Sequence, residues 1–329
     1  MIIYVSTISY ITYLSYTDMT AMLVSSSSSL NLVKSKTAIP PEHILPKRSE
    51  GVKINDISGV FFYKDIFDAI MNRDHASILR IVDQDKRQLE RCDFSHFDVP
   101  ANSIPLLVAI NFGLPIQLIK LLISNTPQRL IGRQNFAGAS ALSLAITRRM
   151  PQDVLSMLIA RTPSEGFSAQ GDFHDSILTL AVLSKVPLDV IAMIIDKTPA
   201  REMGSHLMLA INQHLPLPLF EEMVKKASIE DIRRTVVATM HKNNMSPEYM
   251  CRLAEADLPV ASRGVKVGGY SSWHKLLAHP GDVNFEAIKL ILQRNKDIVG
   301  QLAISEDADG RISFGMASKR VRDEISKYL

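Results

Sequence analysis

Hydrophobic and polar residues repeat at a fixed interval in the middle of the chain. In each copy a short apolar segment contains an alanine, a proline follows that alanine by six residues, and a Thr-Pro pair follows it by 17 and 18. The alanines of three consecutive copies, Ala109, Ala145 and Ala181, are 36 residues apart. A constant period with every part at a constant offset indicates a stacked structural repeat.

Each copy predicts a pair of helices. The first helix is short and centred on the alanine, a small residue that lets a neighbouring helix approach closely. The proline lies where the second helix begins, because the first turn of a helix has no partner for the N–H that proline lacks. Apolar residues 9, 10, 13 and 14 positions after the alanine form one face of this second helix. The Thr-Pro pair ends it, since a residue before proline disfavours the α region.

Weaker units extend the pattern in both directions. One precedes the clear copies at 65–83, and others follow at 207–224, 236–253, 272–292 and 313–329. Polar, glycine-bearing segments of about a dozen residues, such as 128–138, are expected to link the units as excursions from the stack. One hairpin cannot bury its apolar face alone, so the sequence predicts an all-α solenoid of about six or seven stacked hairpins. It covers residues 59–329 and is clearest at 103–227.

Two segments resemble the ankyrin repeat, in which Asp or Asn precedes a Gly and then Thr-Pro-Leu-His-x-Ala. Residues 135–145 read Asn-Phe-Ala-Gly-Ala-Ser-Ala-Leu-Ser-Leu-Ala, with Ser for Thr, Ala for Pro and Ser for His. Residues 307–317 keep Asp, Gly and Ala in the same register, and His274 lies close to the family's histidine position. The resemblance implies an ankyrin-like helical-hairpin solenoid, a protein–protein interaction module or scaffold that binds its partner on a concave face. It also implies that His274 holds neighbouring backbone by hydrogen bonds.

Residues 1–58 differ in composition from the rest. Residues 1–16 are apolar and hydroxylic, a serine run occupies 25–29, and prolines follow up to Pro46. A secretory signal begins with basic residues, but this start has no Lys or Arg. The apolar run is also too short to cross a bilayer. We expect a disordered leader, with a cleaved or targeting segment as the alternative.

Composition and charge restrict the partners. Charged residues make up 22% of the chain and hydrophobic residues 46%, which is typical of a globular protein. A net charge of +3 over 329 residues argues for neither nucleic acid nor a membrane surface, and no membrane span is expected. The two cysteines, Cys92 and Cys251, are far apart and read as unpaired thiols. We therefore expect an intracellular, cytoplasmic and monomeric protein.

No motif predicts catalysis, a cofactor or a metal site. The glycines of 264–272 lack the spacing of a phosphate-binding loop and fall where a turn between units is due. No His-Glu-x-x-His arrangement occurs, and nothing resembles the Gly-x-Ser-x-Gly turn of a serine nucleophile. The sequence predicts a protein that is not an enzyme. The alternative is an enzyme or cofactor-binding protein whose irregular C-terminal third, 228–329, carries the activity.

Large and basic side chains outside the predicted core are the candidates for binding a protein partner, because aromatic residues and Arg dominate interaction hot spots. The candidates in the excursions are Arg129, Arg133, Phe136, Phe167, Phe173 and His174. Those expected on the exposed side of the first helices are Phe112, Arg148, Arg149, Lys185 and His214. For Phe136, Phe167 and Phe173 the alternative is that each ring packs beneath its own loop.

Overall fold

The fold is mostly helical, as the sequence predicts. The computed structural model describes residues 63–92, 94–96, 99–168, 176–242, 245–258, 271–279, 281–307 and 309–329. All of them fall within one compact unit, Gly51–Leu329. The predicted leader, 1–58, lies outside the described residues. No helix among these residues combines the length and the apolar character needed to cross a bilayer.

The helices form eight consecutive pairs within the described ranges, one or two more than expected. The first helices of the pairs are α2 (Ile66–Met71), α4 (Pro105–Asn111), α7 (Ala141–Thr147), α9 (Ile177–Leu183), α11 (Ala200–Asn212), α13 (Ile229–Thr239), α15 (Ser272–Ala278) and α18 (Ser313–Met316). The second helices are α3 (His75–Gln84), α5 (Ile116–Asn125), α8 (Gln152–Arg161), α10 (Leu188–Lys197), α12 (Leu217–Lys226), α14 (Pro247–Ala256), α16 (Asp282–Arg294) and α19 (Lys319–Ser326).

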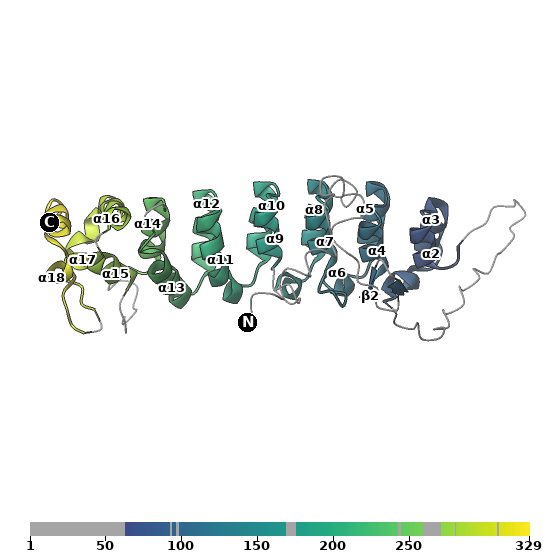
Figure 1. Ribbon diagram of the computed structural model, residues 1–329, viewed down its shortest axis with the longest axis horizontal. Helices are drawn as coiled ribbons and strands as arrows, with labels where there is room; N and C mark the ends of the chain where they lie inside the picture. Colours follow the sequence, from purple (N-terminus) through teal and green to yellow (C-terminus); the bar gives the residue numbers. More distant parts are fainter. Residues whose placement is uncertain are drawn as a thin grey trace, which may run out of the picture. The chain divides into compact units, whose positions relative to one another are not determined.

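Neighbouring pairs pack against each other in sequence order. Each first helix contacts the first helix of the next pair, and each second helix contacts the next second helix. Figure 1 shows this arrangement as two rows of helices. The buried apolar side chains of all the pairs belong to one cluster that begins at Ile66 and ends at Ile325. The helices of the irregular C-terminal third, from α13 onward, pack in the same way as those of the clear copies.

The repeated prolines and threonines mark the ends of the second helices. The prolines that precede α5, α8, α10 and α12 occupy the N-cap, one residue earlier than a first-turn position. The threonines that end α5, α8 and α10 are C-caps, and each hydroxyl donates to the carbonyl four residues back at 2.7–2.8 Å. All three threonines are buried. Each of these carbonyls also accepts the N–H of the same threonine at 2.8 Å, so the hydroxyl adds a second hydrogen bond at the end of the helix.

The alanine of each clear copy is buried within the row of first helices. Ala109, Ala145 and Ala181 have no exposed surface. Helix α7, which carries Ala145, contacts both α4 and α9. A larger side chain at this position would have to displace a neighbouring helix, because protein interiors are close-packed.

The excursions contain helical segments of their own. The first, 128–138, begins with α6 (Gln128–Ile131), which buries Leu130 and Ile131. A 3-10 turn, η3 (Ser164–Phe167), takes the same place after α8. After α10 the excursion is short, and α11 runs without a break from Ala200 into the next first helix. Each of these helical segments starts immediately after the proline of a Thr-Pro pair, which serves as its N-cap.

A small amount of non-helical regular structure departs from the all-α expectation. Strands β1 (Phe94–His96) and β2 (Val99–Ser103) pair antiparallel, with Phe94 opposite Ser103 and His96 opposite Val99. They precede α4, after the 3-10 turn η2 (Lys86–Glu90). Near the C-terminus, η5 (Lys296–Ile298) and α17 (Val299–Ile304) connect α16 to α18.

Candidate protein-interaction surface

The loop that follows α6 is held against strand β2 of the preceding pair. The Phe136 N–H donates to the Ala101 carbonyl at 3.1 Å. The Arg133 guanidinium donates to Asn102 Oδ1 at 2.6 Å, and the Asn102 amide donates back to the Gln134 carbonyl at 3.2 Å. These bonds join residues more than 30 positions apart, so they fix where the loop tip lies relative to the helices.

The tip itself is a turn organised by one side chain. Asn135 Oδ1 accepts from the N–H groups of Ala137 and Ala139, at 3.1 and 3.0 Å. Gly138 has a φ of 72°, a left-handed conformation that glycine adopts without a steric penalty. The Phe136 side chain is 75% exposed in this turn. An aromatic ring of such exposure at the tip of a hydrogen-bonded loop is a candidate contact for a partner.

The same turn recurs near the C-terminus. Asp307 Oδ1 accepts from the N–H groups of Asp309 and Arg311, each at 2.9 Å. Gly310 has a φ of 74°, and its N–H donates to the Asp307 carbonyl at 3.1 Å. The corresponding N–H of Gly138 donates to the Asn135 carbonyl at 2.9 Å. The two segments that resemble the ankyrin motif therefore adopt one local geometry.

The basic candidates expected on the first helices lie in the turns that follow those helices. Arg149, Lys185 and His214 are exposed and have φ values of 51–54°. Arg73 and Gly113 occupy the same position in the first two pairs. In all five turns the next N–H donates to the carbonyl of the pair's alanine, at 2.9–3.2 Å. This is the Schellman arrangement, in which a left-handed residue ends the helix and satisfies two of its last carbonyls.

Three further candidate residues, Arg148, Phe112 and Arg129, already make contacts within the chain. The exposed Arg148 guanidinium donates to Asn111 Oδ1 at 2.7 Å. Phe112 is half-buried and packs against the core, and its carbonyl accepts from Arg73 at 3.0 Å. Arg129, in α6, remains largely exposed and forms an ion pair with Glu90. Arg129 and Arg148 both lie at the C-terminal end of a helix, where the helix dipole stabilises a basic side chain.

The prediction that Phe167 faces a partner is wrong. Its side chain has no exposed surface, because η3 turns the ring into the core between the pairs. Phe173 and His174 lie outside the described residues.

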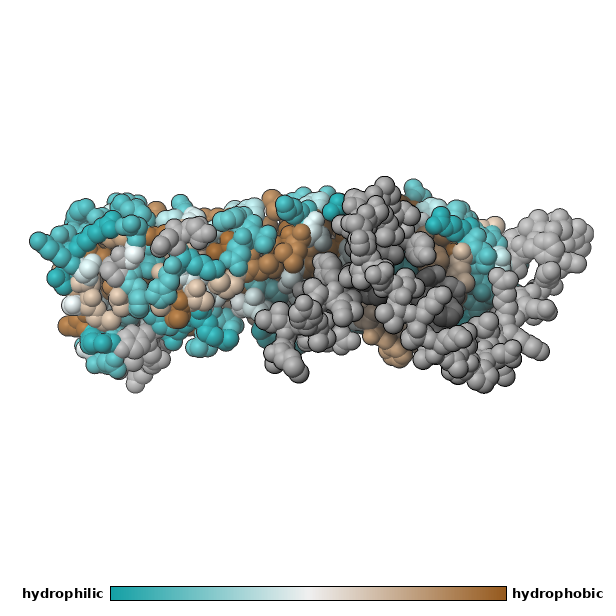
Figure 2. Space-filling view, viewed as in Figure 1, coloured by the Kyte–Doolittle hydropathy of each residue, from teal (hydrophilic) through white to brown (hydrophobic). Residues whose placement is uncertain are grey.

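Figure 2 shows further apolar residues gathered over α9 to α12 on the visible face. In this part of the chain Leu183 and Leu188 are each 51% exposed.

His274 has the structural role that the family resemblance implies. Its Nδ1 is 2.6 Å from the Ser271 hydroxyl and its Nε2 is 3.3 Å from the carbonyl of Ser305, which ends α17 in the connection to the next pair. With the proton on Nε2, the ring accepts from Ser271 and donates to Ser305. Burial lowers the pKa of His274 below its usual range, because the charged imidazolium is disfavoured away from water. The neutral ring therefore links two neighbouring units.

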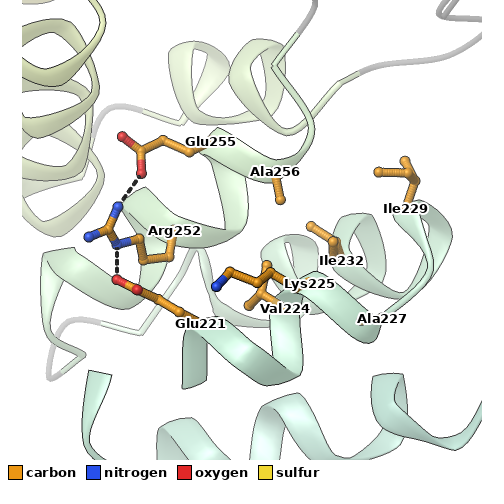
Figure 3. A pocket seen from close by; sticks show the side chains of 9 residues that line it. All are labelled: Glu221, Val224, Lys225, Ala227, Ile229, Ile232, Arg252, Glu255 and Ala256. Atoms are coloured by element: carbon orange, nitrogen blue, oxygen red, sulfur yellow. Dashed lines mark hydrogen bonds and ion pairs between the residues drawn. The ribbon is translucent and has the colours of Figure 1, made fainter. Parts of the chain in front are cut away.

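A shallow groove of about 390 Å³ lies between α12, α13 and α14. Figure 3 shows Arg252 at one end, between the carboxylates of Glu221 and Glu255. Its Nε is 2.6 Å from Glu221 Oε1 and its Nη1 is 2.9 Å from Glu255 Oε2. The other lining residues are Val224, Lys225, Ala227, Ile229, Ile232 and Ala256. The groove is absent from the sequence-based candidates, because it depends on how three helices meet.

The described residues assemble no metal site, and one of the two cysteine thiols is fully buried. Among the described residues, no three His, Cys, Asp or Glu side chains are placed to hold a metal ion. Cys251 is fully buried, and burial raises the pKa of its thiol to about 12. A thiol of that pKa is almost entirely protonated at neutral pH and is a poor nucleophile.

Comparison of the sequence with known protein families and with characterised proteins finds no match in either.

Proposed function

We propose that this protein is an ankyrin-like repeat solenoid that recognises a protein partner and does not catalyse a reaction. The recurring Asx turn at Asn135 and Asp307, and the bridging histidine His274, support the assignment to ankyrin-like repeats. In such a stack the loops and the exposed side of the first helices form the binding surface.

Phe136 carries the functional part of the proposal. The Phe136 ring is 75% exposed, so covering its apolar surface with a partner would be favourable. Its loop is anchored to β2 by backbone and side-chain hydrogen bonds, so little conformational entropy is lost when a partner binds. Arg129 and Arg133 precede the ring in sequence and add charged donors of the kind enriched at interfaces.

Site-specific photo-crosslinking in cells tests this surface. The photoreactive amino acid p-benzoylphenylalanine replaces Phe136, and a matched chain carries it instead of Leu79, which is 50% exposed in α3. We expect a discrete protein adduct from position 136 that position 79 does not give. Arg133→Ser should weaken that adduct, because it releases the loop from Asn102. No adduct at position 136, or the same adducts from both positions, would contradict the proposal.

A further inference from the structure

At two junctions the last residue of a second helix covers the end of the preceding second helix. Arg161, the last residue of α8, donates to the carbonyls of Ile123 and Thr126 at the end of α5, the latter at 2.8 Å. Lys226, the last residue of α12, donates to the carbonyls of Ile195 and Asp196 in α10 at 2.7 and 2.6 Å. The final carbonyls of a helix have no partner within it, and a cation satisfies them and opposes the helix dipole.

The junction between α12 and α14 has no basic residue at this position. The last residue of α14 is Ala256, which has neither the length nor the charge of Arg161 or Lys226. Ile123 and Ile195 are each the third residue from the end of their helix, and in α12 the same position is occupied by Val224. Both Val224 and Ala256 line the groove of Figure 3. The groove is thus the place that a long basic side chain fills at the other two junctions.

We propose that this groove binds an arginine side chain of a partner protein. The arginine would supply the guanidinium that Arg161 provides to α5, and it would satisfy the C-terminal end of α12. Arginine fits better than lysine because its guanidinium is less strongly hydrated than an ammonium group and is therefore easier to remove from water.

The groove lining is compatible with an additional cation. Two carboxylates, Glu221 and Glu255, and two cations, Lys225 and Arg252, give no net charge. Arg252 is paired with both carboxylates, and Lys225 is paired with Glu222 at 2.6 Å. Both cations of the lining are therefore paired with carboxylates, and the last carbonyls of α12 have no partner within the helix.

Apolar side chains provide the remaining contact. Ile229 is 42% exposed, and Ile232 and Ala227 lie beside it along the groove (Figure 3). The methylene groups of an arginine can lie on such a surface while the guanidinium reaches polar atoms. The inference goes beyond the proposed function, because no residue of the groove belongs to the loop around Phe136.

Binding of short peptides to the purified full-length chain tests the inference. The probe is the capped peptide acetyl-Gly-Ala-Arg-Ala-Gly-amide, and the control is the same peptide with citrulline, which keeps the shape of arginine without its charge. Binding is followed by NMR shifts of the Ile229 and Ile232 methyl groups. We expect at least about tenfold tighter binding of the arginine peptide, since a tenfold change corresponds to about 1.4 kcal/mol, less than a charged hydrogen bond contributes.

Variants at Ala256 complete the experiment. Ala256→Arg restores the residue type found in α8 and should abolish the methyl shifts, because the chain's own guanidinium then fills the groove. Ala256→Lys, which copies the residue type at the end of α12, should act in the same way if the arginine variant folds poorly. Ala256→Ser keeps a small side chain and should bind as the natural protein does. Equal binding of both peptides, binding of neither, or unchanged binding by the arginine and lysine variants would overturn the inference. Failure here would leave the crosslinking result at position 136 unaffected, and the reverse also holds.

Discussion

Replacement of Arg161 by methionine measures how much the contact between successive second helices contributes to stability. The guanidinium joins α8 to α5 through two carbonyls, Ile123 and Thr126, which lie 38 and 35 positions earlier in the chain. Arg161→Met keeps most of the apolar stem, so the packing of the side chain changes little. The substitution removes the charge and both hydrogen bonds.

The expected cost is about 2 kcal/mol. A hydrogen bond to a charged group contributes about 1.5–3 kcal/mol, and a cation at a helix C-terminus adds about 0.3–1 kcal/mol. Arg161 is only half-buried, so water can replace part of what is lost and the two bonds do not add in full. With a urea m-value near 2 kcal/mol per M, the unfolding midpoint should fall by about 1 M.

Urea unfolding followed by helical circular dichroism provides the assay, and Lys197→Met is the matched control. Lys197 is the last residue of α10, is exposed, and within the described part of the chain makes no hydrogen bond to the preceding second helix. Its replacement should change stability by less than about 0.5 kcal/mol, as is usual for surface positions. Equal losses from the two substitutions, or no loss from Arg161→Met, would refute the reasoning that underlies the groove.

Three further predictions concern buried groups. Ala145→Leu should destabilise by about 1–3 kcal/mol in the same assay, because the added methylenes are forced between helices that already touch; a cost near zero would show that the position has room. Burial lowers the pKa values of His206 and His274, so each is protonated more readily in the unfolded chain. Their contribution should be complete above the usual histidine pKa of about 6.5 and should be lost as pH falls below it. A His274→Asn variant should show a weaker loss between pH 7 and 5. Iodoacetamide should label the half-buried Cys92 in the folded protein and Cys251 only after unfolding, as peptide mass spectrometry can determine.

Signals that act over a few residues are readable in the sequence. The prolines before the second helices and the Thr-Pro pairs after them predict helix boundaries, and the structure confirms these to within one residue. The alanines of the clear copies are buried between first helices, as their size suggests. These features depend on backbone sterics and on hydrogen bonds within about four residues, so the local order of residues is sufficient to predict them.

The excursions show where such local reasoning stops. Phe136 and Phe167 lie in corresponding loops and are equally apolar, yet one is 75% exposed and the other has no exposed surface. The difference arises from position within the loop: Phe167 stands where α6 has the buried Ile131, whereas Phe136 lies beyond the helical turn, at the loop tip. The sequence likewise predicts helix surface for Arg149, Lys185 and His214, which lie in left-handed turns, because their residue types do not indicate a turn.

The period and order of the helices therefore follow from the chain's own pattern, since each hairpin forms from contacts close in sequence and can bury its apolar face only against the next. The exposure of Phe136, and the groove beside Ala256, depend instead on residues some 30 or more positions apart that meet only when neighbouring pairs pack. The sequence gives the residue types at these helix ends, Arg161 in α8 and Ala256 in α14. Only the packing between units shows that Arg161 donates to the carbonyls of α5 and that Ala256 lines a groove.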